Sequence, residues 1–180
     1  MIPEYLESER LVYCPLSLEH CTNEYVSWMN DPIIYQFLET GGGYTLQMLS
    51  EYLDNVVKTP ILFWGIHIKE SRKHIGNIKI DPINTRHGFG EYGILLGDKQ
   101  EWGKGYAKEA SKAIVEYCFE KCNLRKINLG VVAENIPAVN LYKSLGFVIE
   151  GNYKNHGIYN GKYMDILRMA VFNEKFKYDK

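Results

Sequence analysis

The sequence contains few cysteines and prolines, and neither sign of charge dominates it. Its 180 residues include 4 cysteines and 6 prolines, and the formal net charge is −1. Without a basic excess the chain lacks the field that binds nucleic acid non-specifically, so DNA and RNA are disfavoured as main partners. Cys118 and Cys122 have no second pair downstream and match no zinc-ligand pattern. We therefore expect no metal site, and buried reduced thiols instead.

Long apolar runs are also missing. The apolar run from Ile61 to Ile66 is too short to span a membrane. The start, Met1 to Glu4, has neither the basic residues nor the apolar run of a signal peptide. No repeat, low-complexity tract or linker divides the chain, so one domain over residues 1–180 is expected. We therefore expect a cytoplasmic protein without a membrane partner.

Hydrophobic periodicity and capping residues predict the secondary structure. Strands are expected at 10–16, 61–69, 74–81, 90–97, 127–133, 147–151 and 164–171, and helices at 18–28, 46–58, 103–121 and 135–146. Ser17, Thr45 and Asn135 are the N-cap candidates. Three successive strands from 61 to 97 favour an antiparallel meander, and the strand–helix–strand passage to Ala133 favours one parallel crossover. The predicted fold class is α/β, a mixed sheet with helices on both faces.

The segment Gly103-Lys104-Gly105 stands between a predicted strand and a predicted helix. The first N–H groups of a helix have no internal partner, and the helix dipole adds partial positive charge there. Glycines allow an anion to approach the backbone closely. A third glycine of a dinucleotide fingerprint would fall at Lys108, and the Walker pattern is absent, so neither nucleotide motif fits. By itself the segment favours a helix start that simply needs a tight turn over an anion site.

The downstream half of the chain carries a family resemblance. Gln100-x-x-Gly103-x-Gly105-Tyr106-Ala107 resembles motif A of the GNAT N-acetyltransferases, and Glu134-Asn135-x-Pro137-Ala138 to Gly146-Phe147 resembles their motif B. The resemblance implies a GNAT fold, with a seven-stranded sheet whose strands four and five splay apart. It also implies acetyl-CoA as co-substrate. The closing segment 161–169 is similar to ribosomal-protein alanine and spermidine acetyltransferases, whereas 25–32 with 74–79 looks like GNAT enzymes of surface-sugar biosynthesis.

The resemblance also assigns roles to individual residues. Tyr142 occupies the family's general-acid position, facing the departing sulfur. A cysteine-like thiol has a pKa of about 8.5 against about 10 for tyrosine, so full proton transfer is uphill by roughly 2 kcal/mol and a hydrogen bond to the thiolate is expected. The alternative is an interior tyrosine with a satisfied hydroxyl. The residues expected to bind the cofactor are Leu95, Leu96, Gln100, Trp102, Gly103, Lys104, Gly105, Tyr106, Ala107, Asn135, Asn140 and Lys143.

The general base is less well defined. Some related enzymes place a glutamate five residues before the capping asparagine, but this chain has Gly130 there. Glu91 is the first candidate, directly or through water, against the alternative of an exposed strand-end carboxylate. Glu39 and His74 are weaker candidates.

The acceptor site and the acceptor itself are the least defined features. Trp28, Glu39 and Tyr159 are candidates for acceptor binding. An amino-sugar nucleotide is the preferred acceptor, and a protein N-terminal amine or a polyamine is the alternative. A non-catalytic acyl-CoA-binding module is a third hypothesis. Dimerisation is common in the family, but nothing in the sequence specifies it.

Overall fold

The protein is described by a computed structural model that covers residues 1–38 and 40–176. The strands are β1 Leu6–Glu7, β2 Leu11–Pro15, β3 Leu62–Ile68, β4 His74–Asn84, β5 Phe89–Leu96, β6 Lys126–Val132, β7 Val148–Tyr159 and β8 Lys162–Phe172. The α-helices are α1 Asn23–Asn30, α2 Pro32–Tyr35, α3 Leu46–Lys58, α4 Tyr106–Glu120 and α5 Ile136–Ser144. None of these helices is long and apolar enough to cross a bilayer.

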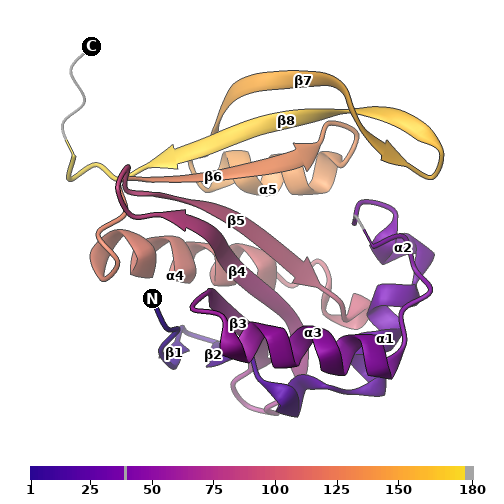
Figure 1. Ribbon diagram of the computed structural model, residues 1–180. Coiled ribbons are helices and arrows are strands. Elements are labelled where there is room, and N and C mark those ends of the chain that lie inside the picture. The colour runs from indigo at the N-terminus through magenta and orange to yellow at the C-terminus, as the bar shows by residue number, and fades with distance from the viewer. Residues whose placement is uncertain (39, 177–180) are drawn as a thin grey trace.

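The strands form one mixed sheet in the order β1-β2-β3-β4-β5-β6-β8-β7. Strands β3, β4 and β5 pair antiparallel, and β5 pairs parallel with β6, so the predicted meander and crossover are confirmed. Figure 1 shows α1 and α3 over one face of the sheet and α4 and α5 over the other. A separate hydrophobic core lies under each pair of helices. The predicted fold class is confirmed, with 8 strands instead of seven because the short β1 adds to the edge of β2.

Strands β5 and β6 separate after a short stretch of pairing. Their register covers only 89–91 against 126–128. Beyond it β5 continues to Leu96 and β6 to Val132 without pairing to each other. The backbone groups along these two facing edges therefore need other partners. This is the splay that the family resemblance implied, and it opens the middle of the sheet.

Helix α3 shows how well a strong local pattern predicts structure. The Thr45 hydroxyl accepts a hydrogen bond from the backbone N–H of Met48 at 3.2 Å, as an N-cap does. Leu49, Leu53 and Val56 are buried on the face toward the sheet. Burial of each such side chain contributes about 1.5–3 kcal/mol. The predicted cap and apolar stripe are both confirmed.

The predicted helix at 18–28 is wrong in its extent. Leu18–His20 forms only a 3-10 turn, and α1 starts at Asn23. The break occurs because Thr22 takes an extended conformation and its side chain accepts from Tyr25 N–H at 3.2 Å, which caps a new helix. Asp31 caps the short α2 in the same way, by accepting from Ile33 N–H at 2.9 Å. A single apolar periodicity across 18–28 hid the cap at Thr22.

Candidate active site

The loop before α4 presents a row of unpaired backbone amides. Gly103 and Gly105 have φ angles of +77° and +83°, which side chains rarely adopt. Gly105 is the N-cap of α4 and makes no side-chain cap bond. Within the described residues, no backbone N–H from Gly103 to Lys108 donates to a protein group. A Cβ at Gly103 would have nothing within 4 Å, so the backbone is open to a ligand. The residues present therefore fit a diphosphate.

The acidic and basic side chains of this loop are already paired with each other. The Lys104 ammonium lies 2.7 Å from Glu101 Oε2, and Glu101 is only 8% exposed. The Trp102 indole donates to the Leu96 carbonyl at 2.8 Å. The anion-binding capacity of the loop before α4 therefore resides in its backbone, whereas Lys108, in the first turn of α4, lines the cleft without an ion pair among the described residues.

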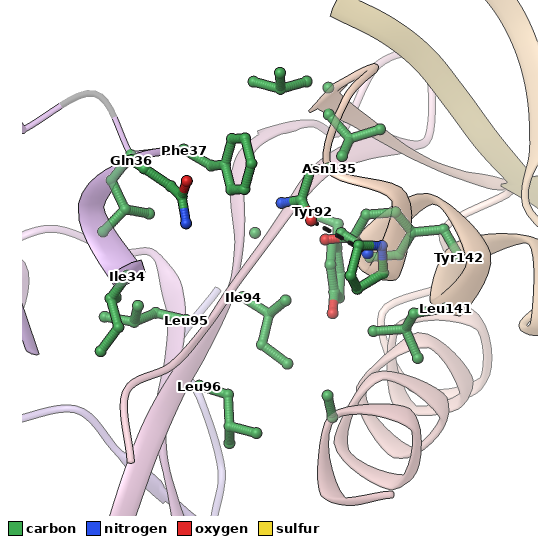
Figure 2. Close-up of a pocket in the computed structure, with 18 of the residues that line it drawn as sticks. Ile34, Gln36, Phe37, Tyr92, Ile94, Leu95, Leu96, Asn135, Leu141 and Tyr142 are labelled. Atoms are coloured by element: carbon green, nitrogen blue, oxygen red, sulfur yellow. Dashed lines mark hydrogen bonds between the residues drawn. The ribbon is translucent and has the colours of Figure 1, made fainter. Parts of the chain in front are cut away.

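A cleft of about 1180 Å³ leads from this loop through the gap between β5 and β6. Figure 2 shows Ile34, Gln36 and Phe37 on one side of the cleft and Asn135, Leu141 and Tyr142 on the other, with β5 side chains between them. The cleft therefore joins the face that carries α4 and α5 to the face that carries α2. A thioester entering from the first side and an amine from the second would meet in the gap.

Tyr142 lies on α5 at the wall of this cleft. It is 8% exposed, and burial raises the pKa of its hydroxyl to about 12. Its ring packs edge-on against Tyr92 at 5.7 Å and tilted against Phe147 at 5.8 Å between centroids. The Tyr92 hydroxyl is bonded to Ser111 at 2.6 Å, whereas the Tyr142 hydroxyl has no hydrogen-bond partner among the described residues. Of Tyr92 and Tyr142, the predicted tyrosine is therefore the one whose hydroxyl is available to a ligand in the cleft.

Glu91 lies on β5 at the cleft wall and is held by an arginine from β8. Arg168 Nη1 and Nη2 lie 2.7 Å from Glu91 Oε1 and Oε2, a bidentate pair. This bond to Glu91 raises the pKa of Arg168 further. Gly130 on the intervening strand makes room for the pair, because a Cβ there would lie 2.9 Å from Arg168 Nη1. Gly130, at the position where some related enzymes carry a glutamate, therefore accommodates an arginine instead.

The structure brings most of the predicted site residues to one cleft. Those lining it are Glu91, Leu95, Leu96, Trp102, Gly103, Gly105, Tyr106, Ala107, Asn135, Tyr142 and Tyr159. Gln100, Lys104, Asn140 and Lys143 do not line it, and the last two are exposed. Glu39 lies outside the described residues. Residues that line the cleft but were not anticipated include Arg168, His156, Ile33, Ile34, Gln36 and Leu38. Asp31-Pro32, an N-cap followed by proline, was the one local signal for the helix that carries Ile33 and Ile34.

Trp28, expected at the acceptor site, lies in the core instead. It is 5% exposed and does not line the cleft. Its ring packs 5.5 Å from Tyr25 and 5.0 Å from His74, and a Cβ on Gly97 would lie 2.1 Å from it. Trp28 is a core residue on the inward face of α1, and this placement does not support stacking on an acceptor. His74, the weaker base candidate, is likewise outside the cleft.

The helix start and the gap between the strands together define a protein of the acyl-coenzyme A transferase class. A family model described as "Acetyltransferase (GNAT) domain" matches residues 10–148. The chain belongs to this GNAT acetyltransferase family, which confirms the prediction from the two motifs. Among the described residues, no group of three His, Cys, Asp or Glu side chains is arranged to hold a metal ion.

Individual relatives agree with this assignment. Spermidine N(1)-acetyltransferase of Vibrio cholerae is 34% identical over 110 residues, which cover 61% of this chain and 63% of that protein. A crystal structure of spermidine N-acetyltransferase from Vibrio cholerae with CoA and spermine superposes with a TM-score of 0.84 at 25% identity, covering 93% of this chain and 98% of that one. Ribosomal-protein-S5-alanine acetyltransferase from Vibrio fischeri shares the fold, with a TM-score of 0.84 at 20% identity and coverage of 97% and 100%.

Proposed function

We propose that this protein transfers the acetyl group of acetyl-CoA to a primary amine of a small molecule. The observation that carries the proposal is the unpaired Tyr142 hydroxyl, which faces the same cleft as the unpaired amides of 103–108. Acetyl-CoA supplies the thioester carbonyl that the amine attacks. The loop amides bind the diphosphate, and Tyr142 interacts with the sulfur. A non-catalytic binding module would need the loop but not the tyrosine.

The environment of Tyr142 favours a hydrogen bond to the sulfur over complete proton transfer. Its pKa of about 12 lies roughly 3.5 units above that of a cysteine-like thiol. Complete transfer is therefore uphill by about 5 kcal/mol, which is more than unperturbed values give. A buried hydroxyl with no competing partner among the described residues still stabilises developing negative charge on sulfur. We therefore assign Tyr142 the role of hydrogen-bond donor, with protonation following late.

The proton released by the amine requires an acceptor, and Glu91 remains the first candidate. Each of its carboxylate oxygens already accepts a bond from Arg168. We propose that Glu91 relays the proton through water and does not remove it directly. Arg168 then keeps the carboxylate oriented toward the cleft.

Polyamines are the first acceptors to test. The spermidine acetyltransferases among the relatives support this class, whereas none of the relatives reported above is named for an amino-sugar substrate. A specific observation favours a second candidate, an amine with a single positive charge. The Glu91 carboxylate is neutralised by Arg168, and Ile34 and Phe37 make the neighbouring wall apolar. A polycation would gain more from unpaired carboxylates, and among the described residues that line the cleft only Glu134 offers one. The amino-sugar nucleotide belongs to this second group.

A thiol-release assay with acetyl-CoA tests the proposal. Spermidine, a peptide with N-terminal alanine and a nucleotide-linked amino sugar form the acceptor panel. Tyr142→Phe should lower kcat by about 10²–10³-fold with CoA affinity retained, since only the donor is lost. Tyr52→Phe, on α3 away from the cleft, is the matched control. Tight CoA binding without turnover on any amine, or full activity of Tyr142→Phe, would contradict the proposal.

A further inference from the structure

The first turn of α4 is tied to the segment before β2 through Glu109. Its Oε1 accepts hydrogen bonds from the Arg10 backbone N–H and the Ser8 hydroxyl, each at 2.7 Å. Its Oε2 accepts from Arg10 Nε at 2.8 Å. The Glu109 side chain is only 15% exposed, so these bonds are partly shielded from water. Two segments about a hundred residues apart in sequence are thereby joined at the start of the helix that carries the amides.

The same arginine continues from Glu109 onto the loop itself. Arg10 Nη1 donates to the Lys104 carbonyl at 2.9 Å. The guanidinium lies 4.6 Å from the centroid of the Tyr106 ring. A Cβ on Gly105 would lie 3.5 Å from Arg10 Nη2. One side chain therefore bonds to Lys104, packs on Tyr106 and lies beside Gly105 between them.

The bond to the Lys104 carbonyl has a direct consequence for anion binding. A peptide unit is planar, and its C=O and the following N–H point in opposite directions. Arg10 therefore fixes the direction of the Gly105 N–H when it holds the Lys104 carbonyl. This matters here because Gly103 and Gly105 on either side can adopt many backbone conformations. Without a contact from outside the loop, ordering these amides around an anion would cost conformational entropy each time an anion binds.

The charge of Arg10 also favours anion binding at the start of α4. Glu109 lies in the first turn of α4, and its carboxylate would oppose an anion at that helix start. The Arg10 guanidinium neutralises it at 2.8 Å. Arg10 thus both shapes the loop and removes a competing negative charge.

We propose that Arg10 is the positioning residue of the diphosphate-binding loop, which it holds in its binding conformation through Lys104, Tyr106 and Glu109. The inference rests on the proposed function, since it takes the diphosphate of coenzyme A as the ligand. Arg10 acts through the loop backbone and is not itself a ligand of the phosphates. It therefore affects cofactor affinity and leaves the chemical step and the acceptor site unchanged.

Calorimetric titration with CoA tests this role without any turnover. Arg10→Met should raise the Kd for CoA about tenfold, because a charge-assisted hydrogen bond and the hold on the loop are lost. Arg10→Lys should give a smaller rise, since an ammonium can reach Glu109 or the Lys104 carbonyl but lacks the fork that serves both. Arg86→Met removes the same charge from an exposed turn residue and should bind CoA like the wild type. Wild-type affinity in Arg10→Met would overturn the proposal.

Two further arms separate positioning from other roles. With 3′-dephospho-CoA as the ligand, the Kd of Arg10→Met should still be about ten times that of the wild type, because the diphosphate is unchanged. A ratio that vanished would make Arg10 a direct ligand of the ribose phosphate and overturn the positioning role. In turnover, Arg10→Met should raise KM for acetyl-CoA, with kcat and the acceptor KM within twofold. A lowered Tm with unchanged Kd would indicate a merely structural residue. If the wild type binds CoA but acetylates no amine, the proposed function fails while the binding test of Arg10 still stands.

Discussion

Three histidines packed beneath α1 should make the stability of this protein sensitive to mild acid. His20 follows β2, His67 lies on β3 and His74 starts β4, and their ring centroids are 4.9–5.3 Å apart. His74 Nε2 is 3.0 Å from Asn77 Oδ1, and its ring also contacts Trp28. Burial lowers the pKa of all three, and that of His74 to about 3. The native cluster is therefore neutral.

The direction and size of the effect follow from linkage. In the unfolded chain His74 has its ordinary pKa of 6.5, so the unfolded state binds a proton that the native state does not take up until about pH 3. The contribution of His74 to stability is complete above pH 6.5 and is lost as the pH falls from 6.5 toward 3. Between pH 7.5 and 5.0 this loss amounts to about 2 kcal/mol. His20 and His67 add to it in the same direction.

Urea unfolding at pH 7.5 and pH 5.0 measures this difference. Between pH 7.5 and pH 5.0 we expect the free energy of unfolding of the wild type to fall by at least about 2 kcal/mol. For His74→Leu we expect this fall to be about 2 kcal/mol smaller than for the wild type, whatever the absolute stability of the variant. His87→Leu, at an exposed histidine, is the control. Carboxylates such as Glu109, whose pKa is lowered from 4.5, act mainly below this pH window. An unchanged loss in His74→Leu would refute the reasoning.

Two further predictions concern the cleft. Gly105→Val, at φ +83° in the amide loop, should raise KM for acetyl-CoA more than tenfold with the acceptor KM unchanged, because a β-branched residue rarely adopts this φ and the loop would leave its binding conformation. Gly161→Val introduces comparable backbone strain in the β7–β8 turn at φ +74° and should affect only Tm; equal KM values in the two variants would count against the loop assignment. Glu91→Gln should lower kcat about 10²-fold near neutral pH and recover as the pH approaches the pKa of the amine, since an unprotonated amine needs no relay. The same loss at every pH would instead indicate that Glu91 and Arg168 only shape the acceptor site.

Local signals predicted those parts of the fold whose cause is local. Thr45 and the Leu49–Leu53–Val56 stripe predicted α3, because a cap and one buried face are sufficient to define a helix. The glycines at 103 and 105 predicted the open helix start, since their conformations exclude most other residues. The same kind of reasoning failed at 18–28, where the cap at Thr22 was hidden inside an apolar pattern.

Local signals could not predict which residues pair with the side chains of the site. Glu91 and Arg168 are 77 residues apart, and they meet because β8 pairs with β6 and Gly130 leaves space between them. Arg10 reaches Glu109 across 99 residues because the fold brings the start of α4 beside the segment before β2. Trp28 has an aromatic side chain of the kind that stacks on ligands, yet its position on the inward face of α1 buries it.

The sequence by itself determined the order of the longer elements, the family and the backbone loop that can receive a diphosphate, because each depends on residues near one another along the chain. Only the tertiary structure decided which charges are paired, which tyrosine hydroxyl has a bond to offer and how far β5 and β6 stay together. Those features depend on strand order and side-chain packing between distant segments. Periodicity and capping signals extend over one element and do not report on such contacts.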